Sequence, residues 1–90
     1  MPPRRRSSPR GPHQAALAQA IELLIAEDDA MTQESVAEEA GLNVRQVNAL
    51  VRGQGNPTYT TIVKLCRGLH VQPGRLMELA DEFYERGSGD

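Results

Sequence analysis

The chain has 90 residues and a formal net charge of −2, which is enough for one small domain. It contains no run of about 18 apolar residues, and its basic start lacks an apolar segment, so neither a membrane span nor a secretory signal is expected. One cysteine, Cys66, excludes an internal disulfide and suits a reducing compartment.

Residues 1–12, MPPRRRSSPRGP, are predicted to form a disordered arm, because Pro, Arg, Ser and Gly bury too little apolar surface to fold alone. Such an arm is either a solvated tail or a segment that reaches the phosphates or minor groove of DNA. The remainder holds six Lys/Arg against twelve Asp/Glu and carries −6, which argues against nucleic-acid binding. The positive charge of the arm comes from Arg4, Arg5, Arg6 and Arg10.

The first predicted helix covers residues 13–27 and ends at the Asp28-Asp29 pair, because Asp prefers turns and caps to helix interiors. Its apolar stripe has helical spacing. His13 lies at the frayed start of this helix and is not expected to be a ligand. The stripe consists of Leu17, Ala20, Ile21, Leu24 and Ile25.

Residues 32–53, TQESVAEEAGLNVRQVNALVRG, are predicted to form two short helices joined by a tight turn. Thr32 is a good N-cap for a helix over 33–40, and Gly41 tolerates the left-handed conformation that ends a helix. Asn43 then caps a second helix over 44–52. A turn this short sets the second helix steeply across the first and makes it protrude.

The apolar pattern assigns the two faces of this pair of helices. One group of side chains is expected to face the interior: Val36, Ala37, Ala40, Leu42, Val47 and Leu50. The other group is left for solvent or a partner: Val44, Arg45, Gln46, Asn48, Ala49 and Arg52.

Two more helices follow a break at Gly53, Gly55 and Pro57. Thr58 is placed to cap a helix over 59–68, in which Tyr59 is expected to be a core ring with its hydroxyl at the rim. Cys66 is expected to be a small buried hydrophobe on the same helix, and His70 its C-terminal cap. Pro73 suits the first position of a last helix over 73–85, and residues 87–90 are expected to fray.

The spacing of Gln33, Val36, Ala37, Gly41, Leu42, Val47 and Leu50 resembles the helix-turn-helix of the Cro/phage-repressor, or XRE, family. The resemblance continues through RGQGNPTYTTIVKLCRGLHVQPGRLMEL and covers about Leu17 to Leu79. It implies an all-α, compact, five-helix lambda-repressor-like domain over residues 13–86, with its motif at 32–53. It also implies a repressor-like transcriptional regulator that binds specific double-stranded DNA sequences in the cytoplasm, in association with the nucleoid.

The resemblance also implies which residues contact DNA, with the helix 44–52 in the major groove. The base-contacting residues would be Val44, Arg45, Gln46 and Asn48. Arg45 suits guanine, Gln46 and Asn48 suit adenine, and Val44 suits the thymine methyl group. The phosphate-contacting residues would be Gln33, Arg52, Gln54, Asn56, Thr58 and Thr60.

Few of these contacts are cationic, so a homodimer on a two-fold site is expected. The last helix can bury one stripe on its own domain, formed by Leu76, Leu79, Ala80 and Phe83. Met77 and Tyr84, seven residues apart, lie on a neighbouring stripe that can pack on a second copy.

Two further functions stay open from the sequence. The fold also serves the antidote half of toxin–antidote pairs, and it serves protein-interaction modules that have lost DNA binding, which would agree with the acidic body. The sequence offers no Cys/His metal spacing, no phosphate-binding glycine loop and no nucleophile with a base, so no cofactor, metal or enzyme activity is expected.

Overall fold

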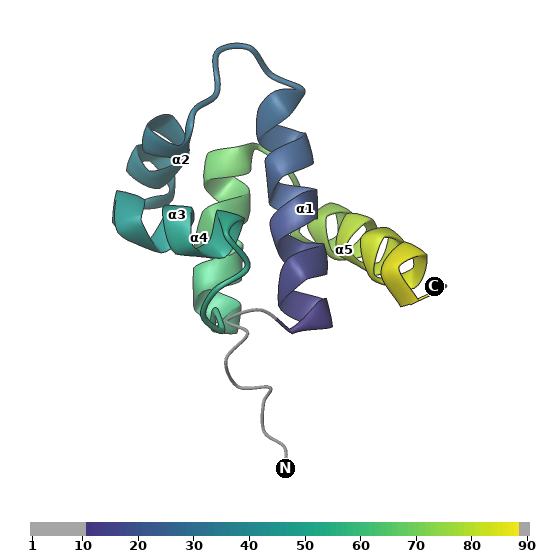
Figure 1. The fold of residues 1–90 in the computed structure, drawn as a ribbon. Coiled ribbons are helices and arrows are strands. Elements are labelled where there is room, and N and C mark those ends of the chain that lie inside the picture. The colour runs from purple at the N-terminus through teal and green to yellow at the C-terminus, as the bar shows by residue number, and fades with distance from the viewer. Residues whose placement is uncertain (1–10, 89–90) are drawn as a thin grey trace.

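The computed structural model describes residues 11–88, which form five helices and no strand (Figure 1). The helices are α1 (Pro12–Ala26), α2 (Gln33–Ala40), α3 (Val44–Val51), α4 (Tyr59–Leu69) and α5 (Pro73–Ser88). The all-α, five-helix prediction is confirmed. Gly11 and Pro12, which the sequence assigned to the arm, begin α1, and Gly87 and Ser88 extend α5. The remaining arm residues lie outside the described residues.

Side-chain caps start α2, α3 and α4 where the sequence predicted them. The Thr32 hydroxyl accepts a hydrogen bond from the Ser35 N–H at 3.0 Å, and Ser35 Oγ accepts one from the Thr32 N–H at 2.9 Å. Asn43 Oδ1 accepts from the Arg45 N–H at 2.7 Å. Thr58 Oγ1 accepts from the Thr61 N–H at 3.2 Å. These bonds satisfy N–H groups that a helix cannot pair within itself.

Two left-handed residues end α2 and α4. Gly41 has φ of 73° and turns the chain from α2 towards α3. His70 has φ of 61°, the one positive φ of a non-glycine residue among those described, and it is the C-cap of α4 as expected. Its Nε2 lies 2.8 Å from Glu39 Oε1, so the end of α4 is tied to the end of α2.

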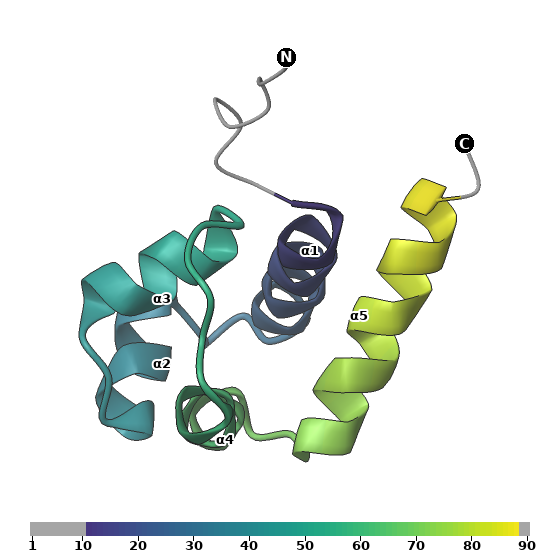
Figure 2. The same cartoon turned by 90° about the horizontal axis from the view of Figure 1, so that it is seen from below.

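The core lies where α1 packs against α5 on one side and against α3 on the other, with α2 lying on α4 (Figure 2). Every residue of the inward face predicted for the α2–α3 pair is buried except Leu42, which is half-buried and packs on the core. Cys66 is buried as predicted, and this burial raises the pKa of its thiol. The largest fully buried side chains are Ile21, Val36, Val47, Leu65, Cys66 and Leu76.

Gly68 sets the distance between α4 and α2. A Cβ at this position would clash with the carbonyl oxygen of Val36 and lie 3.1 Å from the Cβ of Ala40. Because Gly68 has no side chain, the backbone of α4 lies directly against Val36 and Ala40 of α2. A larger residue would push α2 away from α4.

Tyr59 corrects one expectation. Its side chain is 78% exposed and is not part of the core. Tyr59 is the first residue of α4, and helical Cα–Cβ bonds tilt towards the N-terminus of their helix. Tyr59 therefore lies before the inward face of α4, which begins only at Ile62.

Gly68→Ala is expected to destabilise the domain by about 1–3 kcal/mol, because the overpacked contact forces a backbone shift. Gly74→Ala is the matched control, since a Cβ there meets nothing within 4 Å. It should be neutral or slightly stabilising. Urea unfolding followed by circular dichroism measures both, and equal stability of the two variants would contradict the close contact.

Candidate nucleic-acid interface

The two faces of α3 separate core from surface as the sequence predicted for most positions. Val47 is 0% exposed and Leu50 7% exposed, so both hold α3 on the core. Val44 is 41% exposed, and Arg45 and Gln46 are also exposed. Within residues 11–88, the guanidinium of Arg45 takes part in no ion pair. A hydrocarbon side chain and a guanidinium thus lie side by side at the start of α3.

Asn48 is half-buried rather than exposed. Its Nδ2 donates a hydrogen bond to Gln33 Oε1 at 3.1 Å, which links α3 to the first residue of α2. The bond joins one residue predicted to read a base to one predicted to hold a phosphate. It also turns the amide nitrogen of Gln33 away from Asn48.

The amide oxygen of Gln46 is already engaged in a hydrogen bond within the protein. Its Oε1 accepts a hydrogen bond from the N–H of Asn43 at 2.9 Å and completes the capping box of α3. A bidentate contact to adenine needs both the oxygen and the nitrogen of the amide. Gln46 would therefore have to give up this cap to make one.

The loop between α3 and α4 carries the other predicted phosphate contacts. Asn56 and Thr60 are exposed, Gln54 is half-buried, and the Thr58 hydroxyl is engaged in capping α4. Arg52 is the exposed C-cap of α3. The predicted contacts thus surround α3 but differ in how accessible they are.

Gln14 lies on α1 and contacts this loop, and the sequence did not predict that contact. Its Nε2 donates to the carbonyl oxygen of Gly55 at 2.6 Å and to Asn56 Oδ1 at 3.1 Å. Its position three residues after Gly11 is the spacing of a capping box, which could have indicated its role at the helix start. No local signal predicts a contact to a residue 42 positions away.

Charge is segregated along the chain. No acidic residue occurs between Glu39 and Glu78. This stretch contains α3, the α3–α4 loop and α4, and five exposed cations: Arg45, Arg52, Lys64, Arg67 and Arg75. The acidic residues lie on α1, the α1–α2 turn, α2 and α5, together with Asp90.

These features define a helix-turn-helix DNA-binding domain: two capped helices around a left-handed glycine, the second with a polar outer face in a segment free of acidic residues. The chain belongs to the helix-turn-helix family, whose model matches residues 30–76. It is a DNA-binding regulator of the XRE/Cro type.

Solved structures of restriction-modification controller proteins are similar to this chain. The restriction-modification controller protein C.AhdI from Aeromonas hydrophila is 28% identical, with a TM-score of 0.66, over 70% of this chain and 94% of that one. The wild-type restriction-modification controller protein C.Esp1396I is 20% identical, with a TM-score of 0.73, over 82% of this chain and 95% of that one. No curated protein sequence matches the chain significantly.

Among residues 11–88, no group of three or more His, Cys, Asp or Glu side chains is arranged to hold a metal ion. None of the helices in this part of the chain is both long and apolar enough to cross a membrane.

Leu50→Ala and Arg45→Ala should separate stability from binding within one helix. Leu50→Ala removes a buried side chain and should cost about 2–5 kcal/mol of unfolding free energy. Arg45→Ala removes an exposed one and should leave the melting temperature nearly unchanged. Thermal unfolding by circular dichroism tests both, and similar melting temperatures for the two variants would mean that the inward face of α3 is assigned wrongly.

Proposed function

We propose that this protein is a repressor-like transcriptional regulator that places α3 in the major groove of duplex DNA. One observation carries the proposal: the exposed Val44 and Arg45 begin α3 within a segment that contains no acidic residue. In helix-turn-helix proteins the N-terminal residues of the second helix meet the base edges. The nucleoid is then where this protein acts.

Base readout divides among three side chains. Arg45 can donate two parallel hydrogen bonds to O6 and N7 of guanine, and Val44 can contact the methyl group of thymine. Asn48 keeps its oxygen and one N–H for adenine, while its other N–H is held by Gln33. Gln46 contributes only where binding releases it from its cap.

Contacts to the DNA backbone fix the position of α3 without reading sequence. Gln33, at the start of α2, is placed for a phosphate because its amide nitrogen is turned away from Asn48. Arg52, Gln54, Asn56, Thr58 and Thr60 flank the other end of α3, of which Thr58 is the least available. Arg4, Arg5, Arg6 and Arg10 lie outside the described residues, and their charge alone supports a role at DNA phosphates.

The protein-interaction alternative rested on the acidic body. The segregation of charge favours DNA over that alternative, because the acidic side chains belong to elements other than α3, the α3–α4 loop and α4. A DNA-binding face needs local positive potential rather than a positive total charge. An antidote role with a protein partner has no specific observation in its favour.

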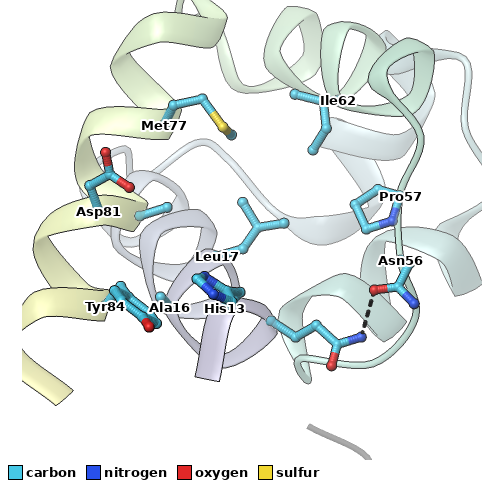
Figure 3. Close-up of a pocket in the computed structure, with 11 residues that line it drawn as sticks. His13, Ala16, Leu17, Asn56, Pro57, Ile62, Met77, Asp81 and Tyr84 are labelled. Atoms are coloured by element: carbon cyan, nitrogen blue, oxygen red, sulfur yellow. Dashed lines mark hydrogen bonds between the residues drawn. The ribbon is translucent and has the colours of Figure 1, made fainter. Parts of the chain in front are cut away.

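We further propose that the protein binds DNA as a symmetric dimer that packs on the Met77 side of the groove between α1, α4 and α5 and leaves the Gln14–Asn56 side of that groove open to DNA. The groove has a volume of about 320 Å³ and is lined by Leu17, Pro57, Ile62, Met77 and Tyr84, among others (Figure 3). Met77 is 40% exposed at its edge. Tyr84 is half-buried and stacks on His13, with ring centroids 4.2 Å apart, so Met77 is the better anchor for a second copy.

Arg45→Ala should weaken binding to the preferred duplex by about 1–3 kcal/mol and relax the preference at one base pair. Arg52→Ala should weaken all sequences alike and flatten the dependence of log K on log[salt] by about one unit. Fluorescence anisotropy on a randomised duplex and on the selected site, over a salt series, measures both effects. No binding of the wild type to any duplex at low salt would overturn the proposal.

Met77→Asp should shift the protein from dimer to monomer, because a carboxylate cannot be buried unpaired in an apolar interface. Tyr59→Asp is the control, since it replaces another exposed large side chain outside the groove and should leave assembly unchanged. Sedimentation equilibrium at micromolar protein tests the pair. A wild type that is monomeric both free and on DNA would exclude the dimer.

A further inference from the structure

The side chain of Gln14 uses both ends of its amide at once. Its Oε1 accepts a hydrogen bond from the N–H of Gly11 at 2.8 Å and caps α1. Its Nε2 donates to the carbonyl oxygen of Gly55 at 2.6 Å and to Asn56 Oδ1 at 3.1 Å. One side chain thus joins the start of α1 to the loop before α4.

Backbone groups fix which way this amide points. The N–H of Gly11 can only donate, so it must face the oxygen of Gln14. The carbonyl of Gly55 can only accept, so it must face the nitrogen. That nitrogen has a second hydrogen, and the atom of Asn56 that meets it must be an acceptor. The orientation of Asn56 therefore follows from two backbone groups through Gln14.

The consequence concerns the free end of Asn56. With Oδ1 held by Gln14, the Nδ2 group of this exposed residue is turned away from the bond, as Figure 3 shows. This group carries two N–H donors, and phosphate oxygens only accept. In the opposite orientation, Asn56 would direct Oδ1, an acceptor, at a phosphate oxygen, which is also an acceptor. A preset donor also avoids the rotamer entropy lost when a free side chain is fixed on binding.

We propose that Gln14 is a positioning residue for DNA binding: it holds the Asn56 amide with its N–H groups directed towards a backbone phosphate. This inference rests on the proposed DNA-binding function. In this proposal, a residue of α1 sets the orientation of the Asn56 contact, although α1 contributes no residue to the helix-turn-helix motif. Gln14 itself need not touch DNA.

Gln14→Ala tests the inference, with Gln19→Ala as the matched control on the exposed side of the same helix. Loss of one oriented hydrogen bond should raise Kd about three- to tenfold on preferred and random duplexes alike. The salt slope should not change, because Asn56 is uncharged. A merely structural effect that displaced Arg52 would flatten the slope instead. Gln19→Ala should bind as the wild type does.

A double-mutant cycle shows whether Gln14 acts through Asn56. In an Asn56→Ala background, Gln14→Ala should change Kd less than about 1.5-fold, since no amide remains to be oriented. Full additivity of the two substitutions would overturn the inference. So would wild-type affinity for Gln14→Ala when Asn56→Ala alone weakens binding.

Gln14→Glu separates two interactions of this side chain: the cap, which is its bond to Gly11, and the clamp, which is its pair of bonds to Gly55 and Asn56. Its carboxylate still accepts from the N–H of Gly11, so the cap of α1 is kept, but it cannot donate to Gly55 or Asn56. Kd should rise at least as much as for Gln14→Ala, with Gln19→Glu as the control for added charge. Unchanged affinity would contradict the proposal.

The clamp can also be tested without DNA, which keeps its failure distinct from that of the proposed function. Nuclear Overhauser contacts between the side-chain amide protons of Gln14 and the backbone of Gly55 and Asn56 are expected in the free protein. Their absence would overturn the clamp even if DNA binds. Failure of the wild type to bind any duplex would instead overturn the proposed function.

Discussion

The close contact of Gly68 with the backbone of α2 is the constraint on which the interface depends. Because no side chain separates α4 from Val36, α2 lies directly on α4, and Glu39 and His70 can pair across the helix ends. The left-handed Gly41 then directs the chain into α3. Val47 and Leu50 hold α3 on the core, so the position of its outer face follows from how closely α2 meets α4.

The sequence predicted the parts of this arrangement that local interactions determine. Thr32, Asn43 and Thr58 cap the helices at the predicted positions because a hydroxyl or amide meets an N–H two or three residues ahead. Gly41 was predictable since a left-handed residue after a helix favours glycine. Helical spacing likewise identified Val47 and Leu50 as core, because one face of a short helix must be buried.

The parts that the sequence did not predict depend on contacts between distant segments. Tyr59 has the spacing of a core residue, but at the first position of α4 its side chain stays exposed, because no other element covers it there. Asn48 was expected to be exposed, and its bond to Gln33 half-buries it. Gln14 has an ordinary place on the first turn of a helix, and its contacts to Gly55 and Asn56 exist only once α1 lies beside that loop.

The acidic residues that follow α1 have little bearing on the Asn56 loop of the proposed interface. The start of α1 is held at the Asn56 loop by Gln14, whereas the acidic residues Glu27, Asp28 and Asp29 follow its other end (Figure 1). A helix of 15 residues is about 22 Å long. That length exceeds twice the Debye length of about 8–10 Å at physiological salt, so these charges are largely screened from the loop. α3, the α3–α4 loop and α4 carry cations and no acidic residue, whereas the nearest acidic side chains in sequence, Glu38 and Glu39, lie at the end of α2.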